Sequence, residues 1–148
     1  MSVSKEFVTA GNATFTVECP ANSPKPHYTF KVRLKEADGK YPEAYFVSML
    51  TGSDNESDYS YVGKLDTFTG QVALTKASKL TPESYAFRLL NRILARIWGD
   101  DHAAYQQHGY KTHHEGKCCR CGRRLTVPSS IESGWGPECI KIAAQEAA

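Results

Sequence analysis

The first 80 residues alternate apolar and polar side chains in short runs, which predicts an antiparallel β-sheet. Phe30, Val32 and Leu34 occupy every second position and are expected to face a core, whereas Lys31 and Arg33 are expected to face solvent. Further strands are predicted at about residues 45–50, 59–65 and 70–74. Turn-forming residue pairs between these runs favour hairpin connections.

A single amphipathic helix is predicted to follow the sheet. Thr81 is a suitable N-cap, Pro82 suits the first helical position, and the pattern ends at Trp98 before Gly99. The apolar face consists of Ala86, Leu90, Ile93, Leu94 and Ile97. Because this face needs a partner, we expect the helix and the sheet to share one core. The residues expected to be buried there are Phe30, Val32, Leu34, Leu90, Leu94 and Ile97.

Three arginines recur at every fourth position of this helix, away from its apolar face. Arg88, Arg92 and Arg96 form this arginine stripe. Arginine stems also cover apolar edges on ordinary solvated helices, so the stripe by itself fits either a binding surface or a plain surface helix.

Four candidate metal ligands lie near the C-terminus, in the pattern His114-x3-Cys118-x2-Cys121-x17-Cys139. Two thiolates one tight turn apart are typical of a zinc knuckle. Cys139 follows a glycine-rich turn and Pro137 at the expected start of a helix, where the positive helix end favours a thiolate. The pattern predicts one structural Zn²⁺ held by these four side chains, in the order of a treble-clef finger.

The fourth ligand is the open point of this site. A standard treble clef has a ligand about one helical turn after Cys139, and here an apolar residue stands at that place. His114 is the preferred fourth ligand, with His113 and Cys119 as alternatives. Ordinary reduced thiols are a further alternative. A disulfide framework is disfavoured because the fifth cysteine, Cys19, is remote in the sequence and the chain is not dense in cysteine.

The chain resembles the core of an uncharacterised zinc-binding domain family of bacteria and their phages over residues 116–139, GKCCRCGRRLTVPSSIESGWGPEC. The family pattern is HxGxCxxCGRxLTxPxSIxxGxGPxC. The resemblance implies the same four metal positions and a phage or mobile-element context. Residues 47–66, VSMLTGSDNESDYSYVGKLD, are similar to segments that often precede this domain. Cys119 departs from the pattern, which leaves the choice among neighbouring thiols open.

These patterns predict an α+β fold, with an antiparallel β-sheet packed by one amphipathic helix and followed by a small C-terminal treble-clef-like zinc finger. The expected division is a sheet-and-helix domain at 1–100, a linker at 101–112 and a zinc-finger domain at 113–148. The 148 residues, 41% of them hydrophobic, suffice for one compact core, so a monomer or a small homo-oligomer is expected. No apolar run approaches the roughly 20 residues of a membrane span, and we expect a cytoplasmic protein without membrane contact.

Charge is unevenly distributed along the chain although the net charge is only +2. Residues 111–141 contain six Lys and Arg against three acids, whereas residues 36–66 contain two Lys against seven acids. A basic segment beside a zinc knuckle favours binding of DNA or RNA through phosphate contacts. The residues expected to make these contacts are Lys117, Arg120, Arg123 and Arg124, together with Arg88, Arg92 and Arg96.

The alternative function is a protein-interaction factor that binds and modulates a host machine. In that case zinc would only stabilise the fold, and the contact residues would be Trp135 and the acidic loop of Asp54, Glu56 and Asp58. The spacing of the acids in this loop does not match a calcium-binding loop.

No enzymatic activity is expected. A nuclease of the His-metal-finger type needs one histidine in the hairpin and another on the helix, and residues 122–141 contain none. The zinc deaminase pattern fails because Glu138 separates Pro137 from Cys139 and no second cysteine follows. Four protein ligands would also close the coordination sphere, whereas a catalytic zinc keeps one position open.

Overall fold

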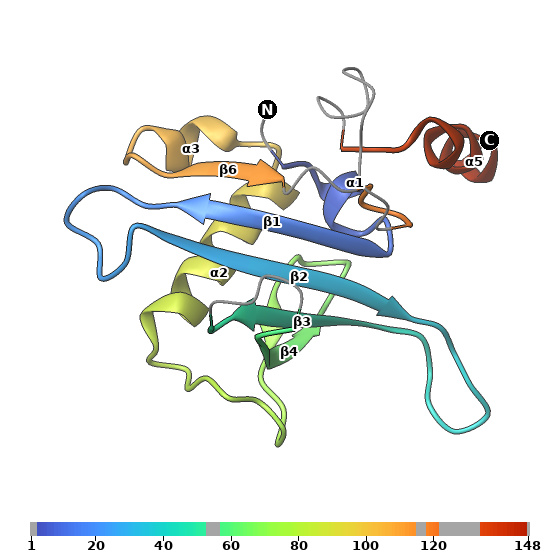
Figure 1. The fold of residues 1–148 in the computed structure, drawn as a ribbon, viewed down its shortest axis with the longest axis horizontal. Coiled ribbons are helices and arrows are strands. Elements are labelled where there is room, and N and C mark those ends of the chain that lie inside the picture. The colour runs from blue at the N-terminus through green and yellow to red at the C-terminus, as the bar shows by residue number, and fades with distance from the viewer. Residues whose placement is uncertain (1–2, 53–56, 115–117, 122–133, 148) are drawn as a thin grey trace.

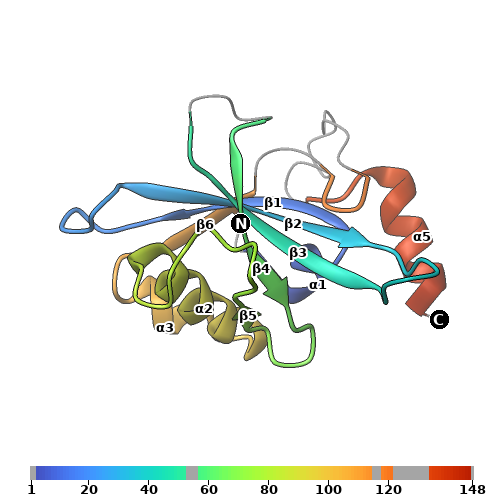
Figure 2. The ribbon, with the colours of Figure 1, turned by 90° about the horizontal axis from the view of Figure 1, so that it is seen from below.

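The computed structural model describes residues 3–52, 57–114, 118–121 and 134–147. Within these residues the chain forms one curled antiparallel sheet with helices packed against it (Figures 1 and 2), which confirms the predicted α+β class. In chain order the elements are α1 (Lys5–Val8), β1 (Asn12–Glu18), β2 (His27–Lys35), β3 (Ala44–Leu50), β4 (Tyr59–Leu65), β5 (Val72–Ala73), α2 (Tyr85–Trp98), α3 (His102–Gln106), β6 (Lys111–His114) and α5 (Pro137–Ala147).

The sheet has the strand order β5-β4-β3-β2-β1-β6, and every neighbouring pair is antiparallel. Phe15 of β1 lies opposite Phe30 of β2, with ring centroids 5.8 Å apart, and both side chains are fully buried. Val32 is also buried, as predicted. Leu34 is only half-buried because it lies next to the end of β2, where the β2–β3 hairpin extends beyond the rest of the molecule (Figure 1).

Helix α2 covers one face of the sheet, with α3 beside it (Figure 2). Leu90, Ile93 and Leu94 are fully buried and Ile97 is nearly so, in one core with the apolar side chains of the strands. The predicted shared core of sheet and helix is thus confirmed, apart from Leu34. No helix in the described part of the chain is both long and apolar enough to cross a membrane.

The start of α2 differs from the sequence prediction. The helix begins at Tyr85, and Ser84 is its N-cap, because the Ser84 hydroxyl accepts a hydrogen bond from the Phe87 backbone amide at 3.4 Å. Thr81, the predicted N-cap, instead closes a turn in which its carbonyl accepts from the Ser84 amide. The end at Trp98, with Gly99 as C-cap, is as predicted.

Residues 101–112, predicted as a linker, contain α3 and the start of β6. Strand β6 pairs with β1, with Phe15 opposite His114 and Glu18 opposite Lys111. Thr112 is buried in this strand, and its hydroxyl accepts a hydrogen bond from the Val3 backbone amide at 3.0 Å. The region therefore completes the sheet rather than only connecting two parts of the chain.

Candidate metal centre

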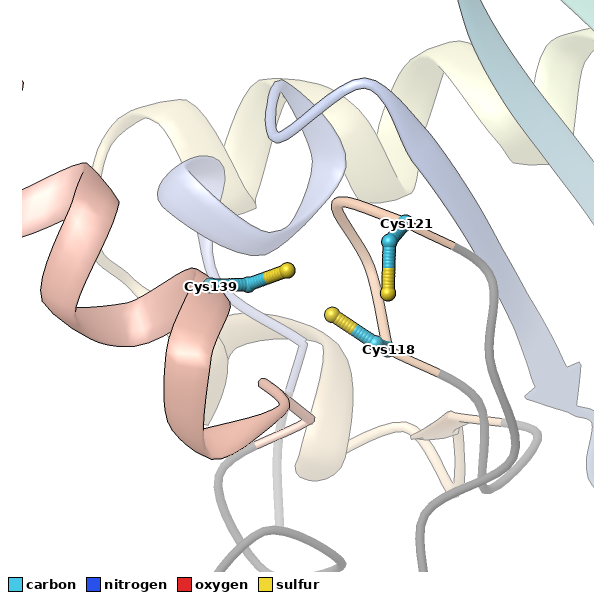
Figure 3. A group of neighbouring side chains, drawn as sticks. All are labelled: Cys118, Cys121 and Cys139. Carbon is cyan, nitrogen blue, oxygen red and sulfur yellow. The ribbon is translucent and has the colours of Figure 1, made fainter.

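Three cysteines converge at the end of the sheet next to α5. The sulfur atoms of Cys118, Cys121 and Cys139 all lie within 4.8 Å of one another. Figure 3 shows Cys118 and Cys121 on either side of a tight turn, with Cys139 reaching toward them from the first turn of α5. Three thiol ligands at this separation could hold a metal ion, since each would lie about 2.3 Å from a shared zinc.

Backbone hydrogen bonds fix the turn that carries two of these cysteines. The Arg120 amide donates to Cys118 Sγ at 3.4 Å, the contact expected of a knuckle. The Cys119 amide donates to the Gly134 carbonyl at 2.9 Å, and the Cys119 carbonyl accepts from the Asn12 amide at 2.8 Å. Gly134 has a φ of +79°, a conformation that favours glycine. The turn is thereby joined to the start of β1 on one side and to the approach to α5 on the other.

The sulfur atoms differ in their tendency to ionise. Burial by itself would raise the pKa of Cys118, but backbone amides of Cys121, Gly136 and Arg120 donate to its sulfur and lower the pKa to about 7. Burial raises the pKa of Cys139, and hydrogen bonds with the Cys121 and Cys118 thiols act in the same direction. Metal ligation requires thiolates, and a divalent cation would offset the mutual repulsion of such closely spaced sulfurs.

Cys119 is directed away from this cluster. Its side chain is fully buried in the main core, whereas Cys118 and Cys139 form a separate small group with Trp135. Burial raises the pKa of the Cys119 thiol far above its ordinary value, and the nearby Cys118 thiol adds to this effect. The geometry thus gives Cys119 a packing role and makes it a poor alternative to Cys118 as a ligand.

The two candidate histidines lie on opposite sides of β6. His113 is exposed, and its Nε2 lies 3.0 Å from Glu18 Oε2 on the neighbouring strand. His114 is half-buried, with its ring centroid 5.9 Å from that of Phe7. Among the described residues, no fourth His, Cys, Asp or Glu side chain joins the three cysteines within 4.8 Å, so His114 as a ligand stays a prediction.

The predicted nucleic-acid contacts are only partly within the described residues. Arg120 belongs to the knuckle, and its Nη1 lies 4.0 Å from Cys139 Sγ. The stripe of Arg88, Arg92 and Arg96 is exposed along α2. The predicted residues that fall outside the described ranges are Lys117, Arg123 and Arg124.

The residues of the alternative, protein-binding surface are similarly divided. Trp135 is half-buried and packs against both the main core and the Cys118–Cys139 group. Asp58 is half-buried next to β4. Asp54 and Glu56 fall outside the described ranges.

Sequence reasoning missed the backbone contact of Asn12 with the cysteine turn and the packing role of Cys119. The Asn12 backbone amide anchors the knuckle to β1, and no sequence signal identifies a backbone contact of this range. Cys119 could have been recognised as a core residue, because a cysteine that neither binds metal nor forms a disulfide usually packs as a small apolar side chain.

Comparison with protein families finds a match to a family of unknown function (DUF6011) over residues 112–142. The matched segment contains both candidate histidines and all three clustered cysteines but covers less than half of the chain. A search of curated proteins finds no match. A search of solved structures finds none either.

Proposed function

We propose that the protein is a non-enzymatic nucleic-acid-binding module whose C-terminal segment is held together by one structural Zn²⁺. The observation that carries the zinc site is the approach of three cysteine sulfurs to within 4.8 Å of one another. Cysteine thiolates are soft ligands that select zinc over magnesium or calcium. A knuckle followed by a helix with a ligand in its first turn supports a treble-clef-like arrangement. The hairpin that would complete it falls at residues outside the described ranges.

We assign the fourth zinc ligand to His114. His113 is engaged with Glu18 on the other face of β6, and Cys119 is packed in the main core. His114 ends β6, and only three residues separate it from Cys118, which is short enough for both to reach one ion. Imidazole nitrogen is a common zinc ligand, and coordination would require the His114 ring to rotate away from its contact with Phe7.

Replacing His114 by alanine is expected to weaken zinc retention, whereas His113→Ala serves as the matched control and is expected to retain zinc. The test is the zinc content that remains after dialysis against increasing concentrations of chelator. Loss of an outer partner of a metal site commonly changes affinity by about 10–100-fold, and loss of a ligand should cost at least as much. The opposite order of the two variants would assign the fourth position to His113.

Two basic regions support nucleic acid as the partner. Arg120 lies beside the cysteine cluster, in a segment where basic residues outnumber acids two to one. On α2, the arginine stripe is exposed and lies opposite the apolar face of the helix. Exposed arginines that recur at helical spacing can contact successive phosphates.

Reversing the charge at Arg120, Arg123 and Arg124 together is expected to abolish nucleic-acid binding without releasing zinc, because none of these side chains is a predicted ligand. Fluorescence anisotropy with single-stranded and duplex DNA and RNA measures the binding, and elemental analysis measures the zinc. For the unaltered protein, affinity should fall steeply with salt because each phosphate contact on duplex DNA contributes a log-log slope of about −0.9. Absence of binding at about 50 mM salt, where such contacts are strongest, would refute the nucleic-acid proposal.

A protein-interaction factor that acts on a host protein or complex is the second candidate function. The observation that favours it is that α5 leaves Ile140 and Ile142 exposed, at 46% and 37%, on two different sides of the helix, so that a partner would bury both by enclosing the helix. The motif resemblance favours a phage or mobile-element setting for such a partner. Co-purification of one defined protein, lost in an Ile140→Ser and Ile142→Ser variant that keeps its zinc, would support this candidate over nucleic acid.

A further inference from the structure

A pocket of about 400 Å³ lies where α2 meets the β1–β2 loop and the segment between α3 and β6. It is lined by Pro20, Asn22, Arg92, Ile93, Arg96, Ala104, Tyr105, His108 and Tyr110. The side chains that offer hydrogen-bond donors come from three separate segments of the chain. Two of the three predicted stripe arginines therefore line one concave site, and Arg88 is not part of it.

The walls of this pocket are held by packing and by hydrogen bonds. Ile93 and Tyr105 are almost completely buried and form a fixed base. Gly109 has a φ of +88°, and a Cβ there would lie 3.1 Å from Pro20 Cβ, so glycine allows the α3–β6 segment to approach the β1–β2 loop. The hydroxyls of Tyr85 and Tyr110 lie 3.0 Å apart, which connects α2 to the residue before β6.

The ionisable side chains that line the pocket include two arginines and one histidine but no aspartate or glutamate. Arg92 and Arg96 lie one helical turn apart, His108 also lines the pocket, and no carboxylate is among the lining residues of the described chain. Arg96 does lie near Asp101, but that pair is 3.7 Å apart with both side chains about half-exposed, so it contributes little. Arg92 pairs with no carboxylate within the described residues.

We propose that this pocket binds a phosphate group, and that in the cell the phosphate belongs to the backbone of a nucleic acid. The guanidinium groups of Arg92 and Arg96 match the planar, two-point recognition of phosphate oxygens. Asn22 adds a neutral side-chain amide donor among the lining residues. The inference rests on the proposed function and adds to it the surface that the nucleic acid contacts.

Tyr110 contributes to the pocket as a neutral side chain and not as a donor to phosphate, because its hydroxyl is engaged with that of Tyr85. The hydrogen bond with the Tyr85 hydroxyl, together with burial, raises the pKa of Tyr110 to about 12. The phenol therefore stays protonated at neutral pH and adds no negative charge to the site.

The pocket is separate from the metal centre. The β1–β2 loop lies at one end of the molecule and α5 at the other in both views (Figures 1 and 2). Strand β1 connects these ends with seven residues, about 24 Å of extended chain. A nucleic acid that contacts both the pocket and the knuckle must span about that distance, or about seven base pairs of duplex.

The test compares Arg92→Gln with Arg33→Gln, which removes the same charge from an exposed position on β2 outside the pocket. In anisotropy titrations with labelled single-stranded and duplex oligonucleotides, Arg92→Gln should weaken binding at least about tenfold, because it removes a charged hydrogen bond to phosphate. On duplex DNA its salt slope should also fall by about 0.9. Arg33→Gln should stay within about threefold of the unaltered protein, since distant exposed charges are screened.

Equal weakening by the two variants would overturn the pocket assignment while leaving nucleic-acid binding intact. If the unaltered protein binds no oligonucleotide, the proposed function fails, and a titration with inorganic pyrophosphate decides the pocket. Saturable NMR shifts at the Tyr110 and His108 amides that disappear in Arg92→Gln would support the phosphate site, with a free phosphate compound as its ligand. Absence of such shifts would overturn the site as well. Because Arg33 and Arg92 are both exposed, neither variant should fail to fold, and thermal unfolding checks this.

Discussion

Cys139→Ser is expected to release the metal and to unfold α5 together with the knuckle, while the packing of α2 on the central strands persists. The zinc content should fall from about one ion per chain to none, because serine is a poor zinc ligand and only two clustered cysteines would remain. A metal-bound segment of this size cannot bury enough apolar surface to stay folded alone. In zinc-finger peptides the metal contributes about 10–16 kcal/mol of apparent free energy, so its loss is the largest effect expected here.

Elemental analysis of protein purified without chelator measures the zinc, and amide hydrogen exchange locates the unfolding. Exchange should accelerate in α5 and in the Cys118–Cys121 turn, but far less at Leu90 and Leu94 of α2. Cys19→Ser is the matched control, because Cys19 is also a buried free cysteine but lies outside the cluster. It should keep its zinc. Absence of stoichiometric metal in the unaltered protein would refute the metal centre.

Leu94→Ala is expected to lower the free energy of unfolding by about 2–5 kcal/mol, which would be a large part of the stability of a domain of this size. Leu94 is fully buried between α2 and the sheet, so truncation removes apolar contacts and leaves a cavity. Urea unfolding followed by circular dichroism measures the difference in the free energy of unfolding.

Leu34→Ala is the matched control for this experiment, with the same side chain removed from a half-buried position at the end of β2. Its loss should be clearly smaller than that of Leu94→Ala. If Leu94→Ala costs less than about 0.5 kcal/mol, as exposed positions usually do, α2 is not packed as described.

The elements with a strong periodic pattern could be predicted from the sequence. The alternation around Phe30 and Val32 and the apolar stripe through Leu90 and Leu94 identified β2, α2 and their shared core. These positions are determined by burial, which imposes a period of two on strands and of 3.6 on helices. The clustered cysteines were likewise identified by their spacing, since a metal ion demands ligands within a few ångströms of one another.

The remaining elements depend on contacts that a local pattern does not contain. Strand β6 has the sequence KTHH, with no large apolar side chain, and it is a strand because its backbone pairs with β1. The start of α2 lies at Ser84 and not at Thr81 because both residues could cap the helix, and it is the Ser84 hydroxyl that makes the capping bond. The sequence also left open whether Cys119 is a metal ligand or a core residue. Its side chain turns toward the main core because apolar side chains from distant parts of the chain pack there.

The pairing of β6 with β1 has a consequence for the order in which this protein folds during synthesis. Strand β1 is made long before its second neighbour, β6, which emerges only after α2 and α3 are complete. At about 5–20 residues per second, β1 stays an unprotected sheet edge for several seconds on the ribosome. The Asn12 amide obtains its hydrogen-bond acceptor, the Cys119 carbonyl, later still, because residue 119 is synthesised after β6. Strand β6 therefore joins the sheet shortly before the three cysteines can come together, and a nascent chain that stalls before residue 111 exposes an edge on which other chains can pair.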